Sequence, residues 1–489
     1  MNPILTLLAA TLSGQATPQD VAPRMLAAVR HEFGSPDVIV FEEAERPRPH
    51  ENEILVRVRA ASVNPLDWHV LEGTPYLARP PAFGLLRPED PRLGVDFAGT
   101  VEAVGRNVTR FRPGDDVFGG VDGALAEYVC LREDGALARK PAEVSFEQAA
   151  AVPIAALTAL QALRDRARVE PGTRVLINGS SGGVGTFAVQ LAKSFGAHVT
   201  GVCSTRNIEL VRLLGADEVI DYTREDPAQV DRSYDVIMDN VGNRMPSDFM
   251  HLLEPNGRYV LVGGGGADDS RWLGPLPQAL QALCLSWITD HELGMFMASL
   301  RSSDLEMLAD MMRTGKLKPV VDRCFRFADT REALRYLEQG RARGKVVVVM
   351  DETSAAVLEK PVPPEQPESR LGAWPVALGL LGPVLAALLV PILGALRLQR
   401  RARERSPARR GFRWGYWFAL EACFLGPLLA ALLGCGSLTV LVTLALYVGL
   451  ALAFVARRRE AWIALTVLSF NPLVWAVNAV YLRKRWREA

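Results

Sequence analysis

The chain has 489 residues, a length that accommodates about three folding units. Its 49% hydrophobic and 22% charged residues exclude a collagen-like, a disulfide-stapled and a wholly disordered protein. The formal net charge of zero hides two unlike parts, because residues 371–489 hold 15 Lys and Arg against 4 Glu, and residues 1–370 carry the matching excess of acid.

Residues 1–24 precede the first regular pattern of the chain. They contain an apolar stretch with small residues at its end, but no basic residue comes before that stretch, so a signal peptide and a disordered extension both remain open. The six cysteines form no CxxC pair and no cluster with histidine at metal-ligand spacing. We therefore expect reduced thiols and no bound metal.

From residue 25 to about residue 145, short apolar segments alternate with proline and glycine, which predicts a mostly β domain with tight turns. From about residue 171 to 265 the pattern changes to buried strands, a glycine loop and helices. Because parallel strands need helical crossovers, this change predicts a parallel α/β sheet. Residues 291–351 are expected to return to the first domain, as helices and turns over 292–340 and as a buried strand over Gly344–Met350.

A glycine loop links a buried strand to an apolar helix in the second domain. Residues 179–185 read Gly-Ser-Ser-Gly-Gly-Val-Gly, and glycine lets the backbone come close to a pyrophosphate. The free backbone N–H groups and the positive end of the following helix stabilise phosphate charge. In this context of strand, loop and helix, the glycines predict a dinucleotide site.

The end of the second strand of this domain indicates which dinucleotide binds. NAD sites usually have Asp or Glu there to hold the ribose 2′-hydroxyl, whereas this chain has Ser204, Thr205 and Arg206. Two hydroxyls and a guanidinium hydrogen-bond well to a 2′-phosphate, so NADPH is favoured. Helix N-capping by Ser204 and Thr205, and a solvated surface charge at Arg206, are the alternative explanations.

The C-terminal part has the composition of a membrane region. Residues 352–370 carry four prolines among charges and predict an extended linker. Residues 371–489 then contain three long stretches with no charged residue or only one, at 371–396, 414–456 and 461–482. Because about 20 apolar residues cross a bilayer, this region predicts two to four transmembrane helices.

Arginine clusters between these stretches leave the topology open. Four simple spans with the rest of the chain in the cytoplasm would put the Arg-rich segment 397–413 outside, against the positive-inside rule. A central hairpin with interfacial outer segments would keep every cluster inside. Glu421 is a rare charge at membrane depth, and it fits either a polar contact in the membrane or snorkelling to its surface.

Several spaced motifs identify a family when they are taken together. They are SVNPLDW, LGVDFAGTVEAVG, FRPGDDVFG, AAVPIAALTAL, NGSSGGVG, GADEVIDY and MDNVG. Over about residues 25–351 the chain resembles the medium-chain dehydrogenase/reductase superfamily, in its zinc-independent quinone oxidoreductase branch and close to the reticulon-interacting NADPH oxidoreductase type. The resemblance implies a GroES-like β barrel from 25–151 and 291–351, and a doubly wound Rossmann sheet from 152–290.

The departures from the zinc-dependent members of that superfamily bear on the chemistry. Where those enzymes have a cysteine and a Gly-His-Glu motif, this chain has Asn64-Pro65 and Gly94-Val95-Asp96. Without zinc there is no Lewis acid to lower the pKa of an alcohol, so oxidation of simple alcohols is not expected. The resemblance implies hydride transfer from a nicotinamide to a quinone or to a conjugated enone or enal, with a proton from water or a hydroxyl.

The resemblance and the residue chemistry above together assign the candidate site residues. Asn64 and Asp67 are the catalytic candidates, because they would orient the substrate carbonyl or a water. The cofactor candidates belong to the pyrophosphate loop, to the adenosine phosphate end, and to the ribose and nicotinamide end: Ser181, Gly182, Gly183 and Val184; Ser204, Arg206 and Tyr222; Thr158, Asn240 and Gly263. Turn chemistry, strand-end packing and buried helix hydroxyls are the structural alternatives at these positions.

These features predict an NADPH-dependent reductase of quinones or enones, held at a membrane in which lipid quinones dissolve, with its catalytic part on the cytoplasmic side. The sequence is compatible with a homodimer, and no nucleic-acid partner is expected. The alternative is a membrane protein whose oxidoreductase-like domain senses NADPH while its tail binds a partner.

Overall fold

The structure is a computed structural model that describes residues 23–350, apart from 77, 78, 80–83, 85, 86, 264–270 and 272. The predicted N-terminal extension up to residue 22, the linker predicted at 352–370 and the membrane region predicted at 371–489, with Glu421, lie outside the described residues. Within the described part of the chain, no helix is both long enough and apolar enough to cross a membrane.

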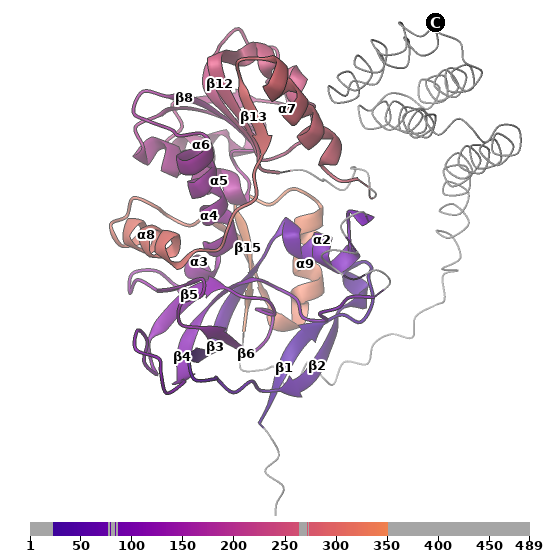
Figure 1. The fold of residues 1–489 in the computed structure, drawn as a ribbon, viewed down its shortest axis with the longest axis vertical. Coiled ribbons are helices and arrows are strands. Elements are labelled where there is room, and N and C mark those ends of the chain that lie inside the picture. The colour runs from indigo at the N-terminus through magenta and orange to yellow at the C-terminus, as the bar shows by residue number, and fades with distance from the viewer. Residues whose placement is uncertain are drawn as a thin grey trace, which may run out of the picture. The chain divides into compact units, whose positions relative to one another are not determined.

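The first domain is built around a seven-stranded sheet. Its strand order is β14-β15-β3-β4-β5-β7, and β6 also pairs with β3. The strands are Glu53–Val63 (β3), Asp96–Val104 (β4), Asp116–Gly120 (β5), Tyr128–Arg132 (β6), Leu137–Arg139 (β7), Val321–Arg326 (β14) and Lys345–Val349 (β15). Figure 1 shows them in one lobe with a separate antiparallel pair, β1 (Arg24–Val29) and β2 (Val40–Glu45).

Alternating apolar side chains hold this sheet together. Ile54, Val56 and Val58 of β3 are buried, and they form one core with Phe97 and Val117 from the neighbouring strands. A period of two places these side chains on the same face of the sheet, which removes that face from water. β3 is therefore a rigid support for the residues that follow it.

Two helices of the first domain lie near the end of β3. They are α2 (Pro65–Glu72), which follows β3 directly, and α9 (Thr330–Glu338), which precedes β15. α2 begins with a proline, whose fixed φ suits the first helical turn, and it ends at Gly73, whose φ of 63° is left-handed. Local sequence therefore sets both ends of the helix that carries the candidate catalytic residues.

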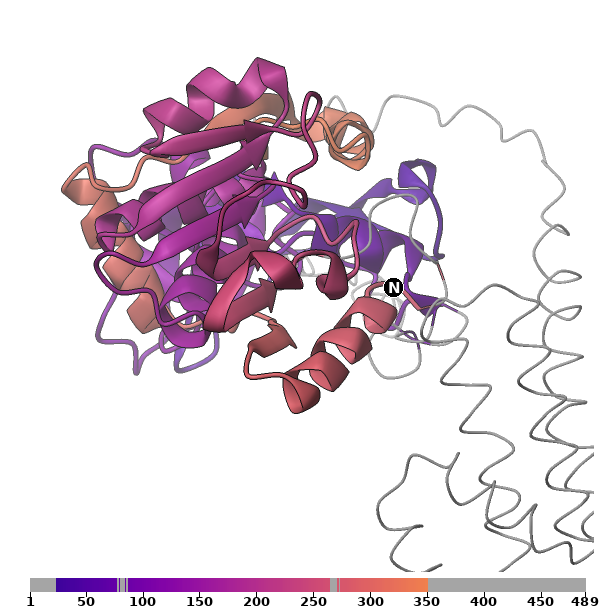
Figure 2. The same cartoon turned by 90° about the horizontal axis from the view of Figure 1, so that it is seen from above.

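The second domain is a parallel sheet of six strands in the order β10-β9-β8-β11-β12-β13. The strands are Arg174–Asn178 (β8), His198–Cys203 (β9), Glu218–Asp221 (β10), Tyr234–Asp239 (β11), Leu253–Leu261 (β12) and Glu292–Met295 (β13). Figure 2 shows this sheet from above. Because the order runs outward in both directions from β8 and β11, the carboxyl ends of these two strands form a topological switch point, where such sheets bind ligands.

Helices pack against both sheets. They include α3 (Phe146–Ala150), α4 (Pro153–Gln161), α5 (Gly183–Ser194), α6 (Ile208–Leu213), α7 (Leu276–Ile288) and α8 (Ser302–Arg313). α3 and α8 contact strands of the first domain, whereas α5 and α6 pack against the parallel sheet. α5 buries Phe187, Val189 and Leu191 in one core with Ile177 of β8. Each such side chain stabilises the fold by about 1.5–3 kcal/mol, so the glycine loop between β8 and α5 lies between two well-packed elements.

Two short strands differ from the sequence-based expectation. Residues 292–340 were expected to form helices and turns, but they contain β13 and β14. β13 pairs with β12, with Met295 opposite Leu261, so the parallel sheet continues past residue 290. Four residues are too few to show a periodicity, and pairing with the neighbouring strand decides their conformation. The strand expected near residue 345 is confirmed, because β15 returns to the first domain and pairs antiparallel with β3.

Candidate functional site

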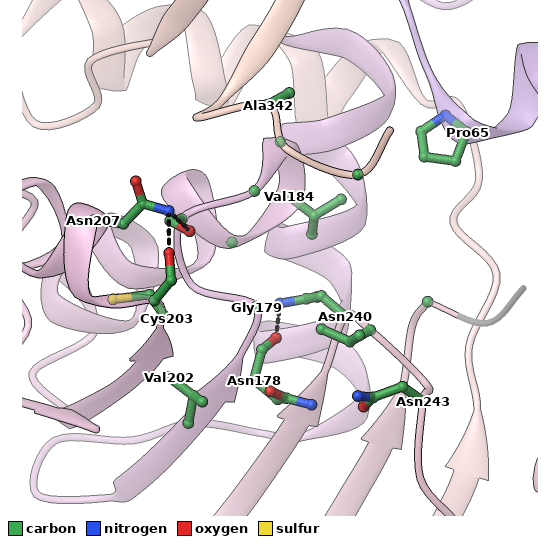
Figure 3. Close-up of a pocket in the computed structure, with 18 of the residues that line it drawn as sticks. Pro65, Asn178, Gly179, Val184, Val202, Cys203, Asn207, Asn240, Asn243 and Ala342 are labelled. Atoms are coloured by element: carbon green, nitrogen blue, oxygen red, sulfur yellow. Dashed lines mark hydrogen bonds between the residues drawn. The ribbon is translucent and has the colours of Figure 1, made fainter. Parts of the chain in front are cut away.

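A cavity of about 830 Å³ opens at the switch point of the parallel sheet. Its wall combines residues that follow β8, β9 and β11 with residues of α2 and β15 from the first domain. The lining contains most of the predicted site residues, namely Asn64, Ser181, Gly182, Gly183, Val184, Ser204, Arg206, Tyr222, Asn240 and Gly263. Figure 3 shows Gly179, Val184, Asn207 and Asn240 around it.

The glycine loop, residues 179–185, has a backbone that larger residues would disturb. Gly179 has a φ of 76°, a left-handed value that favours glycine. A Cβ on Gly185 would lie 2.7 Å from Ser180 Cα, so no side chain fits there. Ser180 anchors the loop, because its N and Oγ donate to Val202 O at 3.0 and 2.9 Å. The backbone N–H groups at the start of α5 are thus fixed at the cavity wall, where they can bind phosphate.

A buried asparagine that the sequence analysis did not select joins the glycine loop to the end of β9. Asn207 Nδ2 donates to Ser181 Oγ at 2.9 Å and to Ser204 Oγ at 3.3 Å. Its Oδ1 accepts from Arg343 Nε at 2.7 Å. One amide therefore fixes both predicted serines. The sequence offers only a weak signal for it, since an asparagine at this place reads as the start of the next helix.

The remaining residues predicted for the adenosine phosphate end lie at the rim of the cavity. Arg206 is exposed, and its Nη2 donates to Arg341 O at 2.8 Å. Tyr222 is 57% exposed, and its backbone N donates to Cys203 O at 3.1 Å. Both side chains line the cavity, so a phosphate at this rim could reach a guanidinium and a phenol.

The residues predicted for the ribose and nicotinamide end have different positions. Asn240 lines the cavity, donates through Nδ2 to Asn178 O at 3.0 Å, and keeps a buried Oδ1 with no partner among the described residues. Gly263 also lines the cavity, but a Cβ there would overlap the Asn240 carbonyl, which already explains the glycine. Thr158 is not part of the lining, and its Oγ1 donates to Ile154 O at 2.7 Å within α4.

The two predicted catalytic residues also differ in position. Asn64 lines the cavity and donates through Nδ2 to Asp96 Oδ2 at 2.9 Å. Asp67 is buried behind it, outside the lining, and its Oδ2 accepts from Asn64 N at 2.7 Å at the start of α2. Burial raises the pKa of Asp67 to about 7. In this geometry Asp67 positions Asn64 and does not itself face the cavity.

Two further residues, Asp96 and Lys345, complete a buried polar group with Asn64. Asp96 is fully buried, and it accepts from Ser62 Oγ at 2.8 Å and from Ile154 N at 2.9 Å. Lys345 Nζ donates to Asn64 Oδ1 and lies 3.4 Å from Asp96 Oδ2. Burial lowers the pKa of Lys345. This lysine was not predicted from the sequence, although a lysine that opens a run of four valines in a buried strand requires a partner.

The residues near Asn64 do not fit a catalytic zinc site. Zinc in proteins is held mainly by cysteine and histidine, whereas the side chains here offer amide and carboxylate oxygens. Those oxygens of Asn64 and Asp96 already bind the Lys345 ammonium. Across the described residues, no group of three His, Cys, Asp or Glu side chains could hold a metal ion.

The same cavity does fit a nicotinamide dinucleotide. Its glycine loop offers backbone donors and little bulk at one part of the wall, and serine and arginine side chains lie at the rim. The buried Oδ1 of Asn240 and the buried Nε1 of Trp68 both lack partners among the described residues, and both residues line the cavity. Buried polar atoms of this kind are normally paired, so they favour a polar ligand.

Comparison with protein families gives two matches within this fold. Residues 50–142 match the alcohol dehydrogenase GroES-like domain. Residues 214–348 match the family described as zinc-binding dehydrogenase. The description of the second family names zinc binding for its members as a group. The side chains around Asn64 in this chain do not fit a zinc site, as described above.

Individual proteins resemble a larger part of the chain. The mitochondrial NAD(P)H oxidoreductase RTN4IP1 of Mus musculus is 36% identical over 354 residues, which cover 66% of this chain and 89% of that protein. The trans-enoyl reductase pgmF of Aspergillus terreus is 37% identical over 323 residues, 62% of this chain and 87% of the relative. The chloroplastic quinone-oxidoreductase homolog of Spinacia oleracea is 33% identical over 350 residues, 67% of this chain and 99% of the relative.

A solved structure has the same fold. The quinone oxidoreductase from Coxiella burnetii aligns with a TM-score of 0.59 and 30% sequence identity, and the alignment covers 67% of this chain and all of that one. The predicted combination of a GroES-like domain with a parallel Rossmann sheet is confirmed.

Proposed function

Because the chain belongs, over about residues 24–350, to the quinone oxidoreductase branch of the medium-chain dehydrogenase/reductase superfamily, we propose that it uses NADPH to reduce a quinone or a conjugated enone or enal. The chain is an NAD(P)H-dependent oxidoreductase, and its relatives include quinone oxidoreductases and trans-enoyl reductases. One observation carries the proposal: a single cavity joins the glycine loop to the buried group of Asn64, Asp96 and Lys345.

The residues of the cavity divide the work of binding and orientation. The N–H groups at the start of α5 bind the pyrophosphate, and Ser181 and Ser204, fixed by Asn207, line the path toward the adenosine end. The bound nicotinamide supplies the hydride. Asn64 also lines the cavity, and its fixed amide limits how the substrate carbonyl lies. Such positioning can contribute much of a rate enhancement.

The preference for NADPH over NADH is supported by where the carboxylates lie. No carboxylate follows β9 directly, and the carboxylate at the end of the neighbouring strand β10 is Asp221, which is not part of the cavity lining. Its oxygens already accept hydroxyls, from Thr205 Oγ1 at 2.5 Å and from Thr223 Oγ1 at 2.7 Å. A carboxylate engaged in this way is a poor partner for a ribose 2′-hydroxyl, and the nearby Arg206 suits a 2′-phosphate.

Membrane attachment is the second element of the proposal. The apolar stretches within 371–489 support a multi-pass anchor, which keeps the catalytic domain on the cytoplasmic side, where NADPH is available. Carbonate washing of membranes should leave the full chain in the pellet, and deletion from Glu359 onward should release soluble, active enzyme. Extraction of the intact chain by carbonate would contradict this anchor.

Deuterium tracing tests the chemistry in membranes that contain the full chain. NADPH that carries deuterium on the transferring carbon of its nicotinamide is incubated with a conjugated enone. We expect one deuterium on the β-carbon of the saturated product and a solvent-derived hydrogen on the α-carbon. Deuterium on the carbonyl carbon would assign a carbonyl reductase instead. Bound NADPH that is never oxidised would favour the alternative of an NADPH-sensing membrane protein.

A further inference from the structure

We propose that Lys345 is a catalytic residue whose ammonium stabilises the negative charge that develops on the substrate oxygen during hydride transfer. The proposal deepens the function proposed above and rests on it. Nothing in the motifs of the sequence selects this lysine, and its case depends on where the fold places it.

Lys345 lies between the glycine loop and Asn64. It is the first residue of β15, it is 3% exposed, and it lines the cavity together with Asn64. Its stem passes the glycine loop, because a Cβ on Gly183 would lie 3.2 Å from Lys345 Cδ. From there the ammonium donates to Asn64 Oδ1. The cation therefore lies at the cavity wall, next to both the glycine loop and the predicted catalytic amide.

The ammonium is held in place without being fully neutralised. Its contacts with Asp96 Oδ2 and Val63 O measure 3.4 and 3.5 Å, longer than the 2.7–3.2 Å of a good hydrogen bond. Asp96, the nearest carboxylate, also accepts from Ser62, Asn64 and Ile154. Donors already satisfy the carboxylate, so the lysine keeps both charge and donor capacity for a further oxygen.

The donor set around the lysine explains how a cation can act here without a metal. At the positions where the zinc-dependent enzymes of this superfamily have cysteine and Gly-His-Glu, this chain has Asn64 and Asp96, and their oxygens hold an ammonium. An ammonium cannot activate an alcohol as zinc does. In a site shielded from water, it can stabilise an oxyanion, because electrostatic interactions strengthen as the dielectric falls.

The step balances with the ammonium as an electrostatic partner only. The hydride brings two electrons and forms a new C–H bond at the β-carbon of the enone. The C=C pair then forms a double bond between the α-carbon and the carbonyl carbon, and the C=O pair moves to the oxygen, where the charge is stabilised by Lys345. Water then gives a proton to the α-carbon and leaves as hydroxide, an oxygen lone pair re-forms the C=O bond, and the product is the saturated ketone. Lys345 keeps its proton throughout.

The test is Lys345→Met in the full chain, with Lys140→Met as the matched control. Lys140 is a partly buried lysine with a side chain 7% exposed and its Nζ 3.7 Å from Asp116 Oδ2, but it lies outside the cavity lining. Loss of one preorganised electrostatic partner typically costs about 100-fold in kcat or more. We expect that fall for Lys345→Met, a change of less than about threefold in its NADPH dissociation constant, and near-normal kcat for Lys140→Met. A normal kcat for Lys345→Met would overturn the proposal.

A double variant and a pH profile separate catalysis from folding. Lys345→Met leaves Asp96 buried without its cation, whereas Lys345→Met with Asp96→Asn removes both charges and keeps an oxygen for Ile154 N. The double variant should fold and remain about 100-fold slow, and a wild-type kcat in it would overturn the proposal.

Lys345 faces Asp96 of β4 and Asp67 of α2, and its pKa is lowered by burial. The wild-type kcat should therefore fall as the pH rises, with a midpoint below the pKa of an ordinary lysine. Lys345→Met should not show this fall.

The failure of this proposal is distinct from failure of the proposed function. If the wild-type chain reduces no quinone and no enone, the function itself is wrong. If the wild type is active and Lys345→Met is equally active with NADPH bound, only the role of Lys345 is wrong.

Discussion

Arg343 Nε lies 2.7 Å from Asn207 Oδ1, and this hydrogen bond joins the two domains at the rim of the cavity. Arg343 Nη2 also donates to Arg206 O at 2.5 Å. Because Asn207 in turn binds Ser181 and Ser204, an arginine just before β15 sets the position of loops that follow β8 and β9.

Replacing Arg343 should therefore weaken cofactor binding without abolishing the fold. A hydrogen bond to a charged group contributes about 1.5–3 kcal/mol, so Arg343→Gln should raise the NADPH dissociation constant by about tenfold or more. Arg313→Gln, which removes an exposed ion pair with Asp310, is the control and should leave it unchanged. Quenching of protein fluorescence measures both constants. Equal affinities for the two variants would show that Asn207 holds the loops without Arg343.

The rim arginine should decide between the two nicotinamide cofactors. We expect NADPH to bind at least about tenfold more tightly than NADH, a difference of about 1.4 kcal/mol. Arg206→Glu should reverse much of this preference, because a carboxylate repels a 2′-phosphate and accepts from a 2′-hydroxyl. Titration of the wild type and the variant with both cofactors measures the ratio. Equal wild-type affinities would disprove the assignment of the rim.

The glycine loop allows a paired test of backbone crowding. Gly185→Ala would place a Cβ 2.7 Å from Ser180 Cα, so the free energy of unfolding should fall by about 1–3 kcal/mol. A Cβ on Gly182 would meet only Gly179 O at 3.5 Å, an ordinary contact, so Gly182→Ala should keep its stability. If Gly182→Ala keeps its stability but binds NADPH more weakly, the added methyl group crowds the bound cofactor and not the fold. Urea unfolding and titration measure the two effects, and equal stability losses would contradict the packing account.

The parts of the site whose residues are neighbours along the chain could be predicted from the sequence. The glycine loop was predicted because a strand, a loop and a helix form a local pattern, and Asn64 was assigned by the family resemblance. Lys345 was not predicted, because 281 residues separate it from Asn64 and only the antiparallel pairing of β15 with β3 brings the two together. Asn207 was missed for the same reason, since Arg343 lies 136 residues away.

For Thr158 the structure shows an alternative to the predicted role, which stays a prediction. The resemblance placed it near the ribose or nicotinamide, but its hydroxyl bonds to Ile154 O in its own helix, and the residue is not among those that line the cavity. A hydroxyl on an apolar helix can always bond to the preceding turn, and sequence alone does not distinguish this use from ligand binding.

Asp67 should make stability depend on pH. Burial raises its pKa from 3.8 to about 7, so the folded state binds a proton that the unfolded state has already released between these values. The contribution of Asp67 to the free energy of unfolding is therefore fully present below about pH 4. It is lost as the pH rises to about 7, and the loss amounts to up to a few kcal/mol. Asp67→Asn should remove this slope.

Urea unfolding at pH 5 and pH 8 measures the effect. The variant should gain stability relative to the wild type at the higher pH, because asparagine has no charge to bury there. Asp310→Asn on α8, where the side chain is 73% exposed, should show no such gain. A constant difference between wild type and Asp67→Asn at both pH values would mean that Asp67 ionises normally.

The most direct test of the central claim is the anaerobic oxidation of NADPH by the full chain, followed at 340 nm with a panel of quinones, conjugated enones, enals and saturated ketones. The cavity joins a dinucleotide loop to a fixed amide and a buried cation, with no donor set for zinc among the described residues. The proposed function predicts NADPH oxidation with at least one quinone or conjugated carbonyl, and none with the saturated ketones. NADPH that binds but is oxidised by no member of the panel would contradict it.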